Sequence, residues 1–241
     1  MDKQRVLLLY GNGIEIFTHQ KENIEYVNTY NDSYCAKIFR NIKPLIGGAI
    51  TNDLKLKIKS YNVIVIFDAF YKKGIIEYIK KRNKDARIIL YFWNRVNATN
   101  ISKNVFDNKD VEIWSYNKED CLNYGIKYNH QFWNPEIVDH KDNDDSYDEC
   151  KYDICFIGNR KGRDSWIGKI EEYSEKNGLK IFMHIVDQGR GKRISYSNHV
   201  NKIACNSRAI LDLVTSENYG LTLRPLESLF LNKKLITTLN R

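Results

Sequence analysis

The sequence predicts an α/β chain with two parallel-sheet domains, because strand-like and helix-like segments alternate along it and the alternation is interrupted once. Short apolar runs recur along the 241 residues, with amphipathic stretches between them. Such alternation is typical of βαβ units, whose strands are parallel. An acidic segment at 139–150, poor in apolar residues, interrupts the pattern. We therefore expect Rossmann-like domains at 1–138 and 151–241, joined by an acidic linker at 139–150.

In the first domain, Val- and Ile-rich runs predict strands, and apolar residues at helical spacing predict helices. The predicted strands are 5–10, 62–67, 87–93 and 112–116, and the predicted helices are 32–42, 73–82 and 118–124. Gly125 follows the last of these helices, where glycine is the residue that most easily ends a helix.

The same alternation restarts after the acidic segment. The predicted strands are 152–157, 180–186, 209–214 and 235–238, and the predicted helices are 165–176, 197–206 and 224–231. Gly178 is well placed to end the first of these helices.

Composition limits the class of protein. Hydrophobic residues make up 42% of the chain and charged residues 28%, which is ordinary for a globular protein. No apolar run approaches the roughly 18 residues of a membrane-spanning helix, and the first residues lack the apolar region of a secretory signal. The five cysteines form no CxxC pair, so neither a disulfide framework nor a zinc site is predicted. We expect a cytoplasmic protein.

The net charge is +8 and is unevenly distributed. Residues 139–149 carry six acids and one lysine, a net of −5, so the rest of the chain carries +13. A basic body favours acidic partners, which are phosphate groups, nucleic acid or an anionic membrane surface. Charge does not choose among these partners.

Two loops of the second domain combine glycines with cations. In an open α/β sheet, ligands bind beyond the carboxyl ends of the strands. The loop at 158–163 contains Gly158 and three cations, Arg160, Lys161 and Arg163, between a strand and a helix, which suits a phosphate at a helix N-terminus. The loop at 189–193 adds three cations, so six would face one crevice. Solvated surface loops have similar compositions, and both interpretations remain open.

A third segment, 216–227, also runs from a predicted strand into a helix. Pro225 fits the first turn of that helix. Arg224 and Glu227 are three residues apart, so they are neighbours on the helix surface. Arg224 and the helix N–H groups suit a phosphate, and the Glu227 carboxylate suits ribose or sugar hydroxyls. A surface Arg–Glu ion pair is the alternative.

Residues 220–238, GLTLRPLESLFLNKKLITT, resemble the C-terminal signature of bacterial glycosyltransferases of the CgeB-like group, also called glycosyl transferases family 1. YDICFIGNRKGR at 152–163 resembles the strand and loop that open the same domain in that group. The resemblance implies a GT-B fold, with a nucleotide-sugar donor in the second domain and an acceptor in the first. It implies a role in lipopolysaccharide or capsule synthesis.

By this resemblance, seven residues of the second domain bind the donor. They are Gly158, Arg160, Arg163, Gly220, Leu221, Arg224 and Glu227. Relatives continue for several tens of residues beyond the strand that corresponds to 235–238, so the resemblance implies an incomplete second domain. This chain also departs from the group at 228–233, where SLFLNK replaces a turn of small residues.

No metal ion or other cofactor is expected. Enzymes of this group stabilise the departing diphosphate with cations and helix dipoles. The sequence has no DxD motif at a strand end, since Asp142-Asn143-Asp144 lies in the acidic segment. Gly11-Asn12-Gly13 lacks the third glycine of a dinucleotide fingerprint.

Asp68 is the candidate catalytic residue. It directly follows the predicted strand at 62–67, where a carboxylate can take a proton from an acceptor hydroxyl. A helix N-cap is the alternative role. His19 is a second residue that would line the cleft between the domains, or would lie in an exposed loop.

The sequence thus predicts transfer of a sugar from a nucleotide sugar to a saccharide or lipid-linked saccharide, with basic residues able to contact the anionic inner membrane surface. Two alternatives remain. One is a non-catalytic relative that binds a nucleotide or glycan. The other is a nucleic-acid binder, suggested by the +8 charge and 16 tyrosines, which predicts a continuous basic face with exposed aromatics. We expect no nucleic acid partner.

Overall fold

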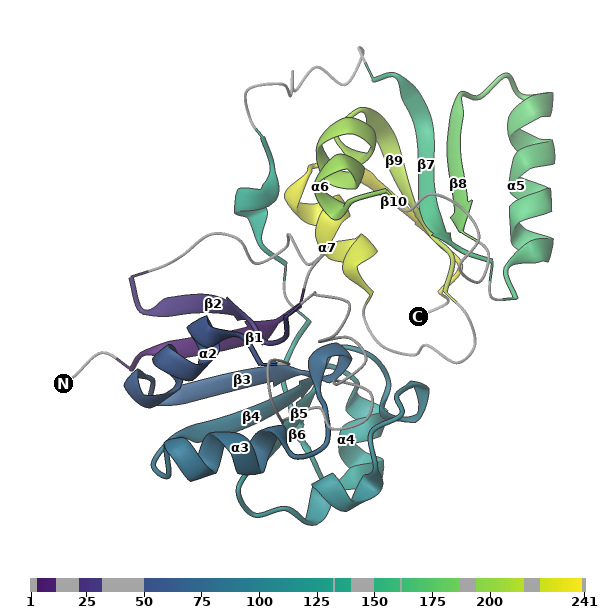
Figure 1. The fold of residues 1–241 in the computed structure, drawn as a ribbon. Helices are drawn as coiled ribbons and strands as arrows, with labels where there is room; N and C mark the ends of the chain where they lie inside the picture. The colour runs from purple at the N-terminus through teal and green to yellow at the C-terminus, as the bar shows by residue number, and fades with distance from the viewer. Residues whose placement is uncertain are drawn as a thin grey trace. The chain divides into compact units, whose positions relative to one another are not determined.

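The computed structural model describes residues 4–11, 22–31, 50–131, 133–139, 150–160, 162–186, 194–214 and 222–239. The chain divides into two compact units, Met1–His130 and Gln131–Arg241 (Figure 1). Each unit is α/β and contains one parallel sheet. The α/β class and the parallel sheets predicted from the sequence are confirmed.

Residues 133–139 belong to the second unit, because a side chain of that unit, Asn201, forms hydrogen bonds with the backbone of this segment. Asn201 Nδ2 donates to the carbonyl of Ile137 at 2.9 Å, and the Asp139 N–H donates to Asn201 Oδ1 at 2.7 Å. The units therefore divide ahead of the predicted linker. Of that linker, residues 140–149 lie outside the described residues.

The first unit contains a six-stranded sheet in which every pairing is parallel. Its strands, in spatial order, are β2 (Ile24–Asn28), β1 (Val6–Tyr10), β3 (Val63–Phe67), β4 (Arg87–Phe92), β5 (Glu112–Ser115) and β6 (Lys127–Tyr128). The four strands predicted from the sequence are present. The sequence did not predict β2 and β6. The five residues of β2, IEYVN, mix apolar and polar side chains, and β6 has only two residues, which is too short for a recognisable pattern.

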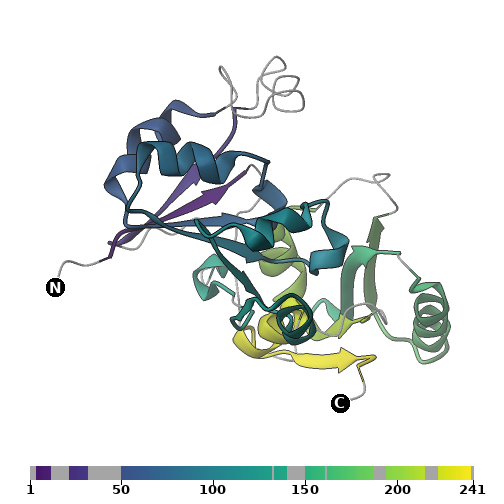
Figure 2. The same cartoon turned by 90° about the horizontal axis from the view of Figure 1, so that it is seen from below.

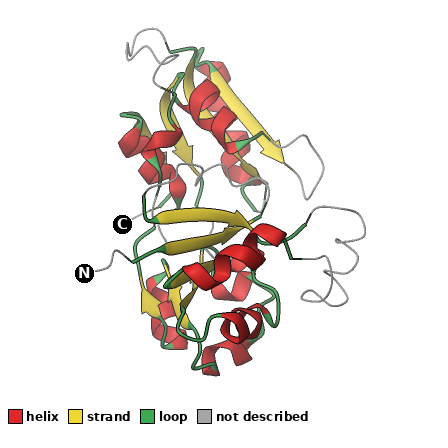
Figure 3. Cartoon of the chain, turned by 60° about the vertical axis from the view of Figure 1, so that its left-hand side comes forward, coloured by secondary structure: helices red, strands yellow, loops and turns green. Residues whose placement is uncertain are grey.

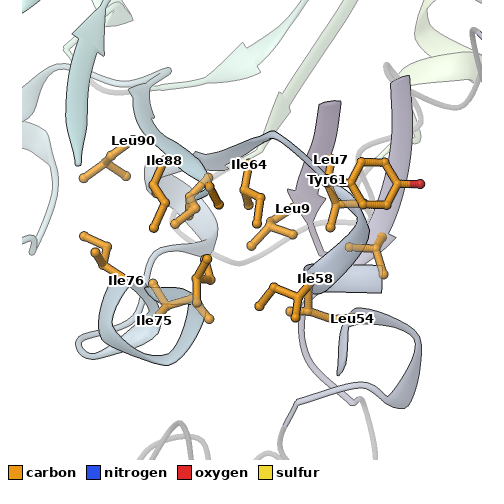
Figure 4. Close-up of a cluster of buried hydrophobic side chains, with 14 of the residues drawn as sticks. Leu7, Leu9, Leu54, Ile58, Tyr61, Ile64, Ile75, Ile76, Ile88 and Leu90 are labelled. Atoms are coloured by element: carbon orange, nitrogen blue, oxygen red, sulfur yellow. The ribbon is translucent and has the colours of Figure 1, made fainter. Parts of the chain in front are cut away.

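Two helices, α2 (Asn52–Lys57) and α3 (Ile75–Arg82), lie side by side on one face of this sheet (Figure 2). Alternate strand residues point toward them, and Figure 4 shows Leu7, Leu9 and Ile64 facing Ile75 and other helix side chains. These residues are 0% exposed. Replacing one such side chain by Ala typically costs about 2–5 kcal/mol.

The helix α4 (Lys118–Tyr124) begins and ends where the sequence predicts. Asn117 caps its start by accepting from the Asp120 N–H, and Gly125 ends it with φ 63°. A side chain at that φ is strained, so glycine is favoured. The predicted helix at 32–42 lies outside the described residues, as does His19.

The second unit contains a four-stranded parallel sheet with the order β10 (Lys234–Thr237), β9 (Ser207–Asp212), β7 (Tyr152–Asn159), β8 (Ile181–Val186). All four strands were predicted, but β7 continues through Gly158 instead of ending there. A Cβ atom at Gly158 would lie 2.8 Å from the ring of Phe156. Gly158 is therefore explained by close packing within the strand.

Helices lie on both sides of these strands (Figure 3). They are α5 (Asp164–Lys176), α6 (Tyr196–Asn198) and α7 (Leu223–Phe230). The predicted helix at 197–206 is present, but after α6 it continues as a π-helix, His199–Ala204. Neighbouring strand residues such as Cys155 and Phe156 enter different core clusters, so both faces of the sheet are buried, as in other parallel sheets.

Candidate functional site

The order of strands in the second unit fixes where a ligand is best accommodated. The chain passes from β7 to β8 on one side, and later returns to β9 on the other side of β7. The crevice between the carboxyl ends of β7 and β9 is therefore the topological switch point. Ligands of open α/β sheets bind at this position.

Arg163 joins the two strand ends at this switch point. Its Nε donates to the carbonyl of Leu213, just after β9, at 2.6 Å. Its Nη1 donates to the carbonyl and to Oδ1 of Asn159, the last residue of β7, at 2.9 and 2.8 Å. Burial lowers the pKa of Arg163, and the nearby Asp212 opposes this shift. The structure thus places this predicted donor-binding residue at the crevice.

The start of α7 lies beside the same strand ends. Thr222 Oγ1 accepts from the Arg224 N–H at 3.3 Å and donates to Asp212 Oδ1, at the end of β9, at 3.0 Å. Pro225 lies in the first turn, as predicted, and carries no N–H. Capping and proline together leave this turn few N–H groups for an anion.

Arg224 and Glu227 form the ion pair that the spacing predicts. Arg224 Nη1 donates to both Glu227 oxygens at 2.8 and 2.7 Å, and Nη2 donates to the carbonyl of Ile157 in β7 at 2.6 Å. Glu227 is 0% exposed and the Arg224 side chain 20%, so the alternative of an Arg–Glu ion pair is present but is buried and does not lie at the surface. The pair ties α7 to the central strand of the sheet.

Two further side chains contact the Glu227 carboxylate. The hydroxyl of Tyr196 donates to Oε1 at 2.7 Å, and the ring nitrogen Nε2 of His199 lies 3.0 Å from Oε2. Tyr196 in turn accepts from Trp133 Nε1 at 2.6 Å. Burial alone would raise the pKa of Glu227, but the charge of Arg224 and these hydrogen bonds outweigh it and hold the pKa well below its ordinary value.

This network favours the neutral form of His199. Burial and the Arg224 charge lower its pKa, and the Glu227 contact opposes them. His199 Nε2 lies 3.0 Å from both Glu227 Oε2 and Arg224 Nη1, so it donates to the carboxylate in one tautomer and accepts from the guanidinium in the other. The other ring nitrogen, Nδ1, is buried with no hydrogen-bond partner in the described part of the chain.

We expect the stability of the second unit to fall as the pH falls below about 6.5, the ordinary pKa of histidine. Because the folded-state pKa of His199 is lowered, its contribution is present above that pH and is lost as the unfolded state takes up a proton. Thermal unfolding at pH 7.5, 6.5 and 5.5 would measure this. His199→Gln retains a donor and does not titrate, so its melting temperature should depend less on pH. Equal pH dependence in both proteins would contradict the assignment.

The other predicted donor-binding residues are not gathered with this network. Arg160 forms an exposed i,i+4 ion pair with Asp164 at 2.8 Å, at the start of α5. Gly220 and Leu221 lie outside the described residues, as does the basic loop at 189–193. The structure therefore brings Arg163, Arg224 and Glu227 to one sheet edge.

Four residues of this site were not singled out from the sequence. They are Trp133, Tyr196, His199 and Asp212. Tyr196 and His199 have a helical i,i+3 spacing, which was the available signal. No local pattern relates either of them to Glu227, which lies 31 and 28 residues further along the chain.

In the first unit, a cleft of about 580 Å³ lies beyond the carboxyl ends of β3 and β4, and Asp68 lines it. Asp68 is 5% exposed. Its Oδ1 accepts from the Trp93 N–H at 2.9 Å, and its Oδ2 accepts from the Asn94 side chain at 2.8 Å. Asp68 is the first residue of the 3₁₀ helix Asp68–Phe70, whose N-cap is Phe67, and its main side-chain partners lie after β4. Burial raises the pKa of Asp68, and these hydrogen bonds oppose the shift.

In the described ranges, no group of three or more His, Cys, Asp and Glu side chains is arranged to hold a metal ion. The Asp142–Asp144 segment lies outside those ranges. Within them, each helix is too short or too polar to cross a bilayer. No family model matches the chain, and no curated protein matches it.

Proposed function

We propose that this chain is a GT-B-type glycosyltransferase that moves a sugar from a nucleotide sugar to a saccharide or lipid-linked saccharide. The observation that carries the proposal is the convergence of Arg163, Arg224 and Glu227 at the β7–β9 switch point. The resemblance of residues 220–238 to glycosyltransferases supports it. The function belongs to cell-surface polysaccharide synthesis in the cytoplasm, with contact at the anionic inner membrane surface.

The donor diphosphate would lie at the carboxyl edge of β7, near Arg160 and Arg163. Arg160 is half exposed and forms an i,i+4 ion pair with Asp164. Exposed ion pairs contribute little to stability, so a ligand anion can replace the carboxylate. Charge stabilisation of the departing diphosphate by these arginines would then accelerate transfer without a metal ion.

Glu227 requires a side-chain rearrangement to bind the donor. Its carboxylate already accepts from Arg224 and Tyr196 and contacts the His199 ring nitrogen, and Glu227 is 0% exposed. A ribose or sugar hydroxyl would reach it by replacing the Tyr196 hydroxyl or the His199 ring. This exchange keeps the number of hydrogen bonds to the carboxylate constant, so its main cost is the movement of a buried side chain.

We expect at least one nucleotide sugar to raise the melting temperature of the protein. A panel of UDP-, GDP-, ADP- and CMP-sugars would identify it, because a ligand that binds only the folded state stabilises it by about 2.7 kcal/mol at 100 times its Kd. Arg160→Ala should reduce this stabilisation without changing the unliganded melting temperature, since an exposed pair contributes little. Glu227→Ala should abolish it.

Lys176→Ala is the matched control, because Lys176 is an exposed cation at the far end of α5 from the carboxyl edge of the sheet. It should leave the ligand-induced shift intact. Equal shifts in wild type, Arg160→Ala and Lys176→Ala would contradict the donor site. A response to random oligonucleotides that falls with salt would favour the nucleic-acid alternative, and donor binding without sugar transfer would favour the non-catalytic relative.

A further inference from the structure

The cleft of the first unit is rich in amide and hydroxyl groups. It is formed by the segment after β3 together with the segment after β4, which includes two short 3₁₀ helices, Val96–Ala98 and Lys103–Asp107. Its polar lining includes Asn94, Thr99, Asn100, Ser102 and Asn104. A volume of about 580 Å³ lies in the range of small-molecule sites, roughly 300–1,000 Å³.

Several of these polar groups have unused hydrogen-bonding capacity. In the part of the chain that the structure describes, the side chains of Asn100, Ser102 and Asn104 make no hydrogen bond to another residue. Each carries both a donor and an acceptor. The cleft therefore presents donors and acceptors together.

Asn94 adds an acceptor whose direction is fixed. Its amide nitrogen donates to Asp68 Oδ2 at 2.8 Å, and a carboxylate at this position accepts only. The amide oxygen of Asn94 is consequently directed away from Asp68. Asp68 is buried and bonded to the backbone of Trp93 as well, so it holds Asn94 in this orientation.

The charges around the cleft are nearly balanced. Lys72 and Lys73 line it on the positive side, and Asp68 and Glu77 on the negative side. A strongly anionic ligand such as a phosphate therefore has little net attraction here. Tyr71, together with other apolar residues of the lining, offers surface for the C–H faces of a ligand.

We propose that this cleft binds an uncharged saccharide through the amide and hydroxyl groups of Asn94, Asn100, Ser102 and Asn104. A sugar hydroxyl both donates and accepts, which is the combination that these side chains present. The identification of this saccharide as the acceptor rests on the proposed transferase function. The proposal that the cleft binds a saccharide does not depend on that function.

The test is binding of the full chain, without nucleotide sugar, to an array of neutral bacterial oligosaccharides, followed by titration of the strongest binder. We expect binding that weakens about tenfold in the double variant Asn100→Ala/Asn104→Ala, because each residue supplies one or two hydrogen bonds. Both side chains are exposed, so the variant should fold. Asn97→Ala/Asn123→Ala is the matched control, with two exposed amides that do not line the cleft.

Absence of binding across the array would overturn the proposal, as would equal weakening in the control or displacement of the saccharide by inorganic phosphate. Failure of the transferase proposal gives a different result. In that case the saccharide binds and the cleft variants weaken it, but no nucleotide sugar stabilises the protein.

Discussion

Glu227→Ala is expected to lower the free energy of unfolding of the second unit by about 3–5 kcal/mol, the usual cost of removing one partner from a buried ion pair. Glu227 is 0% exposed and binds Arg224, which would be left charged and uncompensated beside β7. Tyr196 and His199 would each lose their contact with the carboxylate. Chemical unfolding of wild type and variant would measure the difference.

A double variant tests the cause of this loss. Arg224→Met/Glu227→Leu removes both charges and keeps much of the volume, and such replacements are often nearly neutral. We therefore expect it to be more stable than Glu227→Ala alone. Glu175→Ala, at an exposed position of α5, should change stability by less than about 0.5 kcal/mol. A loss below about 1 kcal/mol in Glu227→Ala would show that the network contributes little.

This prediction also affects how donor binding is tested. A loss of nucleotide-sugar stabilisation in Glu227→Ala can be explained in two ways. Either a contact with the ligand is missing, or the edge of the sheet is disrupted. Glu227→Gln separates them, because it keeps the shape of the side chain and one accepting oxygen. If Glu227 contacts the donor, Glu227→Gln should weaken donor binding more than it lowers the melting temperature of the unliganded protein.

Asp68→Asn is expected to reduce the rate of sugar transfer by about 10²–10⁴-fold, the usual contribution of a general base. Burial raises the pKa of Asp68, which makes its carboxylate a stronger base. Transfer by the wild type should rise with pH as Asp68 loses its proton, and the variant should lack this rise. The measurement is kcat against pH, with the donor that the nucleotide-sugar panel identifies.

The pH profile matters because Asp68 also anchors the turn after β4 through Trp93 and Asn94. If Asp68 only anchors this turn, Asp68→Asn should transfer sugar more slowly but with the same pH dependence as the wild type. Asp107→Asn, at an exposed acid in the 3₁₀ helix beside the cleft, is the control and should keep both rate and profile. An unchanged rate in Asp68→Asn would exclude it as the base.

The sequence determined the class of the fold, because hydrophobic periodicity and glycine stops act over a few residues. The strands at 62–67 and 87–93 contain apolar runs that are typical of strands buried on both faces of a parallel sheet. Gly125 and Gly178 end their helices with positive φ, as expected. The sequence did not predict β2, because its apolar pattern is short and mixed with polar residues. The pairing of β2 with β1 determines that this segment is a strand.

Part of the site was also determined by sequence alone, since the three-residue separation of Arg224 and Glu227 makes them neighbours on any helix. Only the tertiary structure decided that this pair is buried and that Trp133, Tyr196 and His199 complete its network. The physical reason is sequence distance. The crossover connections between parallel strands bring together segments that lie tens of residues apart in the sequence. No local sequence pattern predicts which side chains of these segments contact one another.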